Sequence, residues 1–435
     1  MDLKNKTVTV VGLGNSGVNA ALLLKSRGAA VRATDSGDSP AVKDAAKKLE
    51  DSGVEVETGK HTEDFIKGSS LVVVSPGIEE SSTAVKWAVK YRIPVIGEME
   101  LGYRFCKGRI IGITGTNGKS TVTTLIGEML KDAGLDTVVC GNIGNSLCGE
   151  IPRIREDTWV VLEVSSFQLE RIEKFRPHIA IILNIRDDHM DRYTRFADYF
   201  NEKLKIFLNQ GKNDFLILNK DAEELATIAN GCRAGLNPPY SKILFYSRRE
   251  NKNDVYKMKL KGLHNVENVL ASGVAAKLAG VSEGSIKKTV SNFRGLAHRF
   301  ETVATIDGVE YIDDSKGTTV DSTYRALESC ESPVILIAGG KDKHSDYGAA
   351  KGIAGRKVKR LILIGEAAGA IRKALSGAVA MEDAKDMDDA VLRARDAGVS
   401  GDVVLLSPMC SSFDMFSSYK ERGEVFSRAV KRLKG

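Results

Sequence analysis

Short apolar runs alternate with longer amphipathic stretches through the first hundred residues. The apolar runs predict strands at 7–11, 30–34 and 71–74, and the stretches between them predict helices at 16–26 and 82–90. Strands that alternate with helices form βαβ units and a parallel sheet. Because the runs consist almost entirely of Val, Leu and similar residues, we expect helices on both faces of that sheet.

The same pattern begins again near residue 109 and a third time near residue 301. In the middle stretch, strands are predicted at 109–114, 159–163, 179–183 and 215–218. In the last stretch, strands are predicted at 309–312, 334–340, 360–365 and 402–407. We therefore predict an α/β fold class of three consecutive α/β modules, at residues 1–97, 98–297 and 298–435.

A glycine-rich loop joins the strand predicted at 109–114 to a helix predicted at 121–133. Its residues are Gly115, Thr116, Asn117, Gly118, Lys119, Ser120 and Thr121. Glycines let backbone N–H groups point inward at phosphate oxygens, and the helix N-terminus adds partial positive charge. Lys119 is placed to reach the β- and γ-phosphates, and Ser120 to ligate magnesium. Ile113 stands where the strict P-loop pattern has its first glycine, so an ordinary glycine turn is the alternative.

Three further residues of the middle stretch are candidates. Glu163 ends the strand at 159–163, where a carboxylate suits a magnesium ion on ATP phosphates, or where it caps the helix that follows Ser165. His189, in NIRDDHMDRY, follows another strand and is either a metal ligand or a satisfied polar side chain. Lys203 lies on an amphipathic helix, and its spacing alone predicts a solvated lysine.

The first module carries its own glycine-rich turn. GLGNSG at 12–17 follows a strand, and Asp35 ends the next strand roughly twenty residues later, as in the dinucleotide-binding fingerprint. SPGI at 75–78 adds a tight turn at the same rim. These features predict a pyrophosphate on the helix N-terminus, and a UDP group fits them too. A glycine turn without a ligand is the alternative.

Three loops of the last module follow strands and converge on one rim. They are DDSKGT at 313–318, AGGKDK at 338–343 and SPMCSSFDMF at 407–416. Their candidate side chains for a small anionic substrate are Lys316, Thr318, Lys343 and Ser412, although each alone is typical of a surface residue. In HRFE at 298–301, Arg299 faces either a nucleotide or a surface acid.

Composition narrows the class of protein. The 63 basic and 57 acidic residues give a net charge of +6, which is too mild to indicate nucleic-acid binding but suits anionic small molecules. The six cysteines form no CxxC pair or Cys/His cluster, which argues against zinc and disulfides. No apolar run approaches the roughly 20 residues of a membrane span, and the start does not resemble a signal peptide. We expect a cytoplasmic monomer without nucleic-acid or membrane partners.

Seven stretches, taken together and in their order along the chain, resemble the motifs of the Mur ligases of peptidoglycan synthesis. They are GTNGKS, LEVSSFQLE, DDHMDRY, HNVENVLAS, HRFE, DDSKGT and SPMCSSFDMF. The resemblance covers all three modules, and implies Rossmann-like first and third modules around a central P-loop module. It also implies an ATP-dependent carbon–nitrogen ligase that works through an acyl phosphate. SSFQLE, DSK and SxDMF are most similar to the member that adds D-glutamate to UDP-N-acetylmuramoyl-L-alanine.

The resemblance further implies roles for single residues. Two magnesium ions and the ATP phosphates would contact Lys119, Ser120, Glu163, His189 and a carbamate on Lys203. Asn268, Arg299 and Asp314 would contact the adenine, a phosphate and the ribose of ATP, respectively. The UDP-linked substrate would contact Gly14, Ser16, Asp35, Ser36, Ser75, Gly77 and Asn142. D-Glutamate would contact Lys316, Thr318, Lys343, Ser412 and Phe413.

Other functions explain fewer of these features. An NAD-dependent dehydrogenase would use GLGNSG and Asp35, but it would leave GTNGKS and the third module unexplained. A non-catalytic nucleotide-binding scaffold would not need the lysine-rich rim of the third module. A sibling Mur ligase with another amino acid, or an enzyme like folylpolyglutamate synthetase, shares the P-loop and the order of modules. The first module disfavours the folate alternative.

Overall fold

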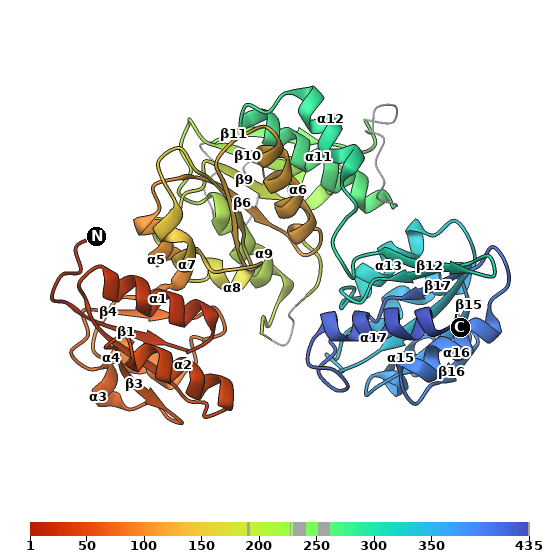
Figure 1. The fold of residues 1–435 in the computed structure, drawn as a ribbon, viewed down its shortest axis with the longest axis horizontal. Helices are drawn as coiled ribbons and strands as arrows, with labels where there is room; N and C mark the ends of the chain where they lie inside the picture. Colours follow the sequence, from red (N-terminus) through yellow and green to blue (C-terminus); the bar gives the residue numbers. More distant parts are fainter. Residues whose placement is uncertain (189–191, 227, 229–240, 251–261, 434–435) are drawn as a thin grey trace. The chain divides into compact units, whose positions relative to one another are not determined.

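The computed structural model describes residues 1–188, 192–226, 228, 241–250 and 262–433, and these residues form three sheets (Figure 1). One sheet lies in each of the three predicted modules, which confirms the α/β fold class. Contacts between residues divide the chain into two compact units, which are described separately: Met1–Lys252 with Val269–Thr289, and Asn253–Asn268 with Val290–Gly435. The first two sheets belong to the first unit. The module boundaries at 97 and 297 stay predictions.

The first sheet has five parallel strands in the order β3-β2-β1-β4-β5. The strands are β1 (Thr7–Val11), β2 (Ala30–Asp35), β3 (Glu55–Thr58), β4 (Leu71–Val74) and β5 (Val95–Gly97). The helices are α1 (Asn15–Ser26), α2 (Pro40–Glu50), α3 (Glu63–Ile66) and α4 (Thr83–Lys90). Central β1 and β4 are almost wholly buried, which explains why valine and leucine fill most of their positions. Strand β3 was not predicted, because this edge strand is polar and partly exposed.

The second sheet has six parallel strands in the order β11-β10-β9-β6-β8-β7. The strands are β6 (Arg109–Thr114), β7 (Thr137–Gly141), β8 (Trp159–Glu163), β9 (Ile179–Ile182), β10 (Phe215–Asn219) and β11 (Lys242–Tyr246). The helices are α5 (Glu98–Phe105), α6 (Lys119–Asp132), α7 (Leu147–Glu150), α8 (Ser166–Leu169), α9 (Phe196–Leu204), α10 (Glu223–Ala226), α11 (Leu263–Leu278) and α12 (Glu283–Asn292), with 3₁₀ turns at Ile151–Arg153 and Lys205–Phe207. Because all strands are parallel, the loops after β6, β8 and β9 meet at one edge of the sheet.

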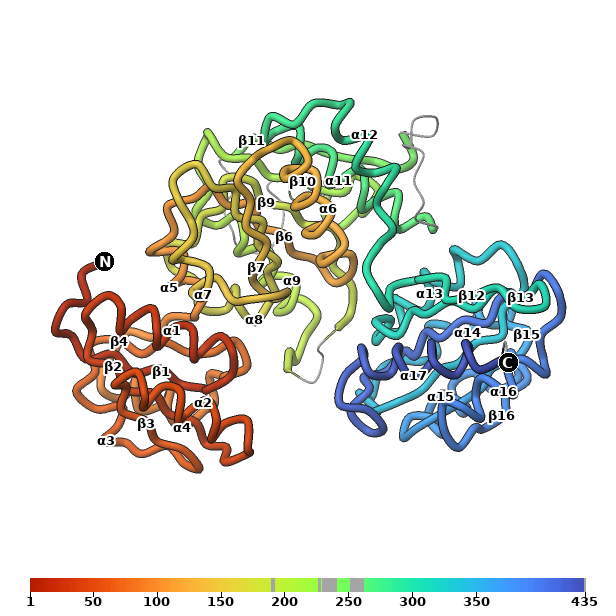
Figure 2. Tube along the Cα trace, viewed as in Figure 1, coloured from red at the N-terminus to blue at the C-terminus, as the bar shows by residue number. Residues whose placement is uncertain are grey.

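The third sheet has the order β12-β13-β17-β14-β15-β16, and only β12 is antiparallel to its neighbour. The strands are β12 (Glu301–Ile306), β13 (Val309–Asp313), β14 (Val334–Gly339), β15 (Val358–Ile364), β16 (Met381–Asp383) and β17 (Val403–Leu406). The helices are α13 (Val320–Ser329), α14 (Lys351–Lys357), α15 (Ala368–Ala374), α16 (Met387–Ala397) and α17 (Tyr419–Arg432), with a 3₁₀ turn at Tyr347–Ala350. Two apolar clusters cover the sheet: α13, α14 and α15 pack on one face, and α16 and α17 on the other (Figure 2).

In the described part of the chain, every helix is too short or too polar to cross a membrane.

Candidate functional site

The loop between β6 and α6 curls because two of its glycines adopt backbone angles that side chains resist. Gly115 has a φ of 150°, and Gly118, the N-cap of α6, has a φ of 87°. Helix α6 therefore starts at Lys119, two residues earlier than predicted, and places Lys119 and Ser120 in its first turn. The first N–H groups of a helix lack carbonyl partners within it, and the helix dipole favours an anion there. This local geometry suits a phosphate group.

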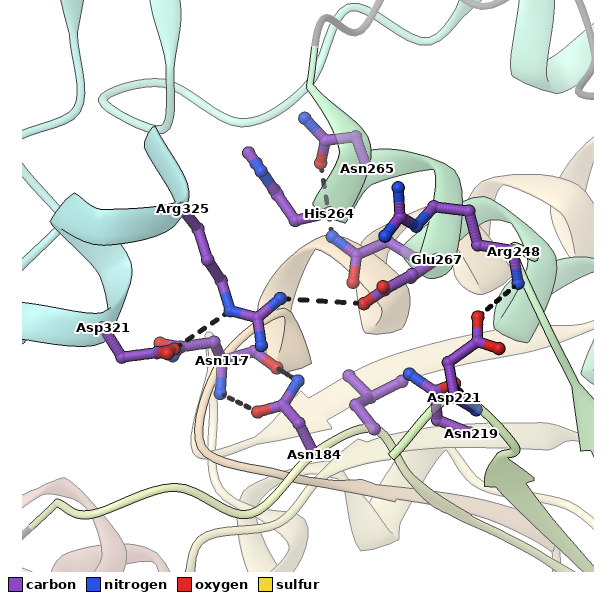
Figure 3. A network of polar contacts seen from close by, with 12 residues as sticks. Asn117, Asn184, Asn219, Asp221, Arg248, His264, Asn265, Glu267, Asp321 and Arg325 are labelled. Carbon is purple, nitrogen blue, oxygen red and sulfur yellow. Dashed lines mark hydrogen bonds and ion pairs between the residues drawn. The ribbon is translucent and has the colours of Figure 1, made fainter. Parts of the chain in front are cut away.

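Hydrogen bonds from the segment after β9 fix the shape of this loop. The N–H of Thr116 donates to the Asn184 carbonyl at 2.9 Å. Asn117 and Asn184 exchange two bonds: the Asn117 N–H donates to Oδ1 at 2.9 Å, and Nδ2 donates to the Asn117 carbonyl at 3.1 Å (Figure 3). The Arg186 N–H donates to Thr116 Oγ1 at 2.9 Å. The loop is thus held in position before a ligand arrives, which lowers the cost of ordering it.

Two lysine amines lie against the carbonyl groups of the loop. Lys119 Nζ donates to the carbonyls of Gly115 and Thr116, each at 2.9 Å, and Lys203 Nζ donates to that of Gly115 at 3.0 Å. The Lys203 residue is only 2% exposed, so the solvated lysine predicted from spacing alone is wrong. Burial and the nearby charge of Lys119 lower the pKa of Lys203 well below its ordinary value, against the opposing effect of Asp188 and Glu163. The site therefore favours a neutral amine at this position.

Glu163 ends β8 directly beside the P-loop strand and is buried. Its Oε1 accepts a hydrogen bond from Asn142 Nδ2 at 2.9 Å. Its Oε2 is buried without a hydrogen-bond partner among the described residues. The capping alternative is wrong, because Ser165 caps α8 and forms a capping box with Gln168. A buried carboxylate oxygen without a partner is costly unless a cation completes its shell, so the donors here fit a divalent metal ion.

The buried face of α9 carries a residue that the sequence analysis missed. Tyr199 lies one turn before Lys203; its hydroxyl is 3.1 Å from Thr116 Oγ1, and its ring centroid is 4.6 Å from Lys203 Nζ. Positions 199, 200, 203 and 204 are all buried, and this helical spacing is the signal that would have identified Lys203 as buried. His189 lies outside the described residues, so its role stays a prediction.

The rim of the first sheet gathers six of the predicted residues at the ends of neighbouring strands. These are Gly14 and Ser16 after β1, Asp35 and Ser36 at the end of β2, and Ser75 and Gly77 after β4. Asp35 accepts two backbone N–H groups, from Leu13 on Oδ2 at 2.7 Å and from Gly37 on Oδ1 at 2.8 Å. The carboxylate therefore fixes the shape of the glycine turn. Asn142, the seventh predicted residue, follows β7 and contacts Glu163.

Arg192, which the sequence analysis also missed, links this rim to the second sheet. Its guanidinium forms a bidentate pair with Glu170, at 3.1 and 2.6 Å, and lies 4.5 Å from the centroid of the Phe167 ring. Its Nη1 reaches the carbonyl of Gly77 at 3.5 Å. The turn that carries Gly77 is thus in contact with the SSFQLE segment through one arginine.

In the second unit, the candidate residues of the third sheet lie at the ends of β13, β14 and β17, which are neighbours. Lys316 Nζ sits 4.1 Å from the Tyr419 ring centroid. Ser412 is buried, whereas Phe413 is 72% exposed. Thr318 and Lys343 occupy the loops after β13 and β14. The structure therefore places this predicted set along one edge of one sheet.

Arg422 organises that edge from inside α17, and sequence reasoning missed it. It is completely buried and donates to Ser315 Oγ at 3.0 Å, the Ser315 carbonyl at 2.8 Å and the carbonyls of Cys410 and Ser411 at 3.2 Å. Burial lowers the pKa of Arg422 to about 10. One side chain thus joins the loops after β13 and β17. An arginine on the buried face of an amphipathic helix was its only sequence signal.

The three residues predicted to contact the adenine, a phosphate and the ribose of ATP also belong to the second unit. Asn268 Nδ2 donates to Asn265 Oδ1 at 3.2 Å. Arg299 lies between His298 and Phe300, whose φ angles of 62° and 52° are left-handed. Burial raises the pKa of Asp314 to about 7, although Ser407 Oγ donates to its Oδ2 at 2.8 Å. In the same unit, Arg325 pairs with Asp321 and Glu267 at 3.0 and 3.8 Å (Figure 3).

Comparisons with known proteins agree across the chain. Three family models match: the Mur ligase MurD-like N-terminal domain at residues 6–97, the Mur ligase middle domain at 113–276 and the Mur ligase glutamate ligase domain at 298–410. Two relatives named UDP-N-acetylmuramoylalanine–D-glutamate ligase, from Koribacter versatilis and Pelotomaculum thermopropionicum, are each 42% identical over 100% of this chain and 99% of their own.

Solved structures show the same fold at low sequence identity. A pseudomurein peptide ligase type C from Methanothermus fervidus matches with a TM-score of 0.60 and 18% identity, over 99% of this chain and 100% of that one. A MurF ligase from Thermotoga maritima in complex with ADP matches with a TM-score of 0.62 and 13% identity, over 99% of both chains. At these identities the similarity concerns the fold alone.

Proposed function

The chain belongs to the Mur ligase family, and we propose that it joins D-glutamate to UDP-N-acetylmuramoyl-L-alanine at the expense of ATP. The observation that carries this proposal is the 42% identity to D-glutamate ligases over the whole chain. The glycine loop with Lys119 supports a triphosphate, and the rim at Asp35 supports a UDP group. Both lie at the ends of parallel strands, where α/β sheets bind their ligands.

The proposed reaction has two steps. An oxygen of the L-alanyl carboxylate attacks the γ-phosphorus, the bond to the β-phosphate oxygen breaks, and an acyl phosphate and ADP result. The amine of D-glutamate then attacks the acyl carbon, phosphate leaves, and the nitrogen loses a proton to solvent. Lys119 and the N–H groups of the first turn of α6 hold the phosphates and stabilise the charge that moves onto the β-phosphate.

Magnesium would be held by Ser120, Glu163, His189 and Lys203, and it would neutralise charge on the phosphates and on the attacking carboxylate. The Glu163 Oε2 atom, buried without a described partner, supports this assignment. The lowered pKa of Lys203 supports a carbamate there. A neutral amine attacks carbon dioxide, forms the N–C bond and releases one proton. The product is an anion that suits a cation far better than an ammonium group does.

The two substrates would occupy the rims of the first and third sheets. Gly14, Ser16, Asp35, Ser36, Ser75, Gly77 and Asn142 would contact the UDP-linked sugar. Lys316, Thr318, Lys343, Ser412 and Phe413 would contact D-glutamate. Asn268, Arg299 and Asp314 would contact the adenine, a phosphate and the ribose of ATP, respectively. We further propose a cytoplasmic monomer that supplies a peptidoglycan precursor, and thereby supports cell shape and division.

An amino-acid panel tests the function. Purified protein receives ATP, magnesium and UDP-N-acetylmuramoyl-L-alanine with D-glutamate, L-glutamate, L-alanine or a diamino acid, and released phosphate is measured. We expect rapid release with D-glutamate only, and mass spectrometry should show one added glutamyl residue. Equal release with L-alanine or the diamino acid would assign the chain to a sibling activity. No release with any acceptor would contradict ligase function.

A further inference from the structure

A depression of about 890 Å³ lies at the edge of the second sheet that faces away from the P-loop. Arg109 begins β6, His178 precedes β9 and Asp214 precedes β10. These three strands are neighbours and parallel, so their amino ends form a continuous rim. The P-loop follows the opposite end of β6, and the five steps from Arg109 to Thr114 separate the two edges by about 17 Å. The depression is therefore separate from the proposed ATP site.

Positive charge dominates this depression. Four cations line it, Arg104, Arg109, Lys174 and Arg176, against one lining carboxylate, Asp214. Arg176 Nε donates to Asp214 at 2.6 Å, and Arg104 is held by Glu100 and Glu173. Arg109 and Lys174 pair with none of the carboxylates that the structure describes; the Arg109 guanidinium lies instead 5.7 Å from the Trp159 ring centroid. Two cations are thus held rigidly, and two more are left for an anion.

The rest of the depression is lined by His178, which lies beside Asp214, and by a group of apolar and aromatic side chains. Tyr103, Cys106 and Ile110 line it, and Tyr103 packs edge-on against Phe175 at 5.5 Å between ring centroids. A bound inorganic ion would use only the cations. An aromatic face beside a group of arginines suits a base or sugar linked to phosphates. The volume is also within the usual range of sites for organic ligands of that size.

We propose that this depression binds a nucleoside di- or triphosphate, as a second site distinct from the P-loop. Arg109 and Lys174 take the phosphates, the fixed guanidinium of Arg176 adds a third positive contact, and the ring of Tyr103 faces the base. The site lies on the connection from α5 into β6, which joins the first sheet to the second. A ligand bound here would therefore contact the segment that leads into β6, the strand that ends at the P-loop.

Isothermal titration calorimetry with ADP on the full-length protein tests this proposal by counting sites. We expect two sites in the natural chain. The double variant Arg109→Ala/Lys174→Ala should lose one of them, with at least a tenfold drop in affinity, and keep the other. Lys119→Ala should weaken the other site and leave this one unchanged. Thermal unfolding of each variant shows that the fold is retained.

The matched control also removes one arginine and one lysine, but from positions outside the depression. Arg155 and Lys212 are exposed and lie outside the depression, so Arg155→Ala/Lys212→Ala should keep both sites. A single site in the natural chain would overturn the proposal. So would an unchanged second site in the Arg109/Lys174 variant, or an equal loss in the control, which would indicate unspecific attraction of ADP to positive charge. Loss of all binding on Lys119→Ala would place every ADP at the P-loop.

Discussion

Two glycine turns in the first unit each join a strand to the helix that follows it, and the charged side chains around them differ. GLGNSG follows β1 and opens α1, and GTNGKS follows β6 and opens α6. In the first turn a carboxylate, Asp35, holds the backbone through Leu13 and Gly37. In the second, two amines, Lys119 and Lys203, lie on the carbonyls. The same strand–turn–helix unit is therefore held by a carboxylate in one sheet and contacted by two amines in the other.

The glycines also have different tasks in the two turns. A Cβ on Gly17 would lie 1.8 Å from the Gly12 carbonyl oxygen, so this glycine allows α1 to approach its own turn. A Cβ on Gly115 would meet Leu183 and Asn184, which belong to the segment after β9. The first turn is thus closed on itself, and the second is braced by a neighbouring strand. The fold supplies the turn, and side chains from elsewhere in the sheet decide which ligand it accepts.

Lys119→Ala should have the largest effect, because it removes the cation that distinguishes the second turn. We expect ligation to fall about 1,000-fold, or about 4 kcal/mol of transition-state stabilisation. D-Glutamate-dependent phosphate release measures it. Lys131→Ala, on the exposed end of the same helix, is the control and should keep nearly full activity. Comparable rates in the Lys119 and Lys131 variants would show that the turn does not bind phosphate.

Lys203→Ala should reduce ligation about 100-fold, and formate or acetate at high concentration should restore part of it, since a carboxylate can replace the proposed carbamate. Phosphate release with and without the acid measures the rescue. Lys212→Ala, which removes an exposed lysine, should keep the full rate of phosphate release, and the added acid should not change that rate. A full rate in Lys203→Ala would contradict any role at the site, and a loss that no acid repairs would contradict the carbamate.

Burial of Lys203 should also make the stability of the protein depend on pH. Its pKa is depressed in the folded protein, so between that value and the unfolded value of 10.5 the unfolded chain binds the extra proton. Stability contributed by this group therefore rises with pH across that interval. In buffer free of carbon dioxide, where the side chain stays a free amine, Lys203→Met should raise the melting temperature at neutral pH, and the gain should shrink as pH approaches 10. A gain independent of pH would mean that packing, not charge, is responsible.

Sequence patterns predicted the three modules and most central strands, because these runs are buried on both faces and their composition alone identifies them. β1, β6 and β8 have the predicted bounds, whereas β3 was missed because its alternating, half-exposed residues carry no such signal. The glycine loop between β6 and α6 was predicted because its strand, its glycines and the start of its helix are all visible in one short stretch of sequence. Tyr199 and Arg422 were missed because their roles depend on contacts with chain segments 83 and 107 residues away.

Gly17→Ala should destabilise the first sheet without touching the phosphate turn. The added Cβ meets backbone at 1.8 Å, and overpacking of this kind costs about 1–3 kcal/mol, here at the upper end. Thermal or denaturant unfolding measures it. Gly14→Ala is the matched control: Gly14 has a φ of −68° and open space around its Cβ position, so its stability should change little. Equal stability of the two alanine variants would show that α1 does not need its close approach.

Asp35→Asn should have the smallest effect and the most specific one. An asparagine side chain has one acceptor oxygen where Asp35 now accepts two backbone N–H groups, so its NH₂ group must face one of these donors. The turn should loosen, and KM for the UDP-linked substrate should rise about tenfold, or about 1.4 kcal/mol, while kcat and KM for ATP change little. Initial rates with each substrate varied separately measure this split. If the KM for ATP rose in parallel, the two turns would act as one site. ATP binding would then depend on the turn at Asp35 as well as on the turn at Lys119.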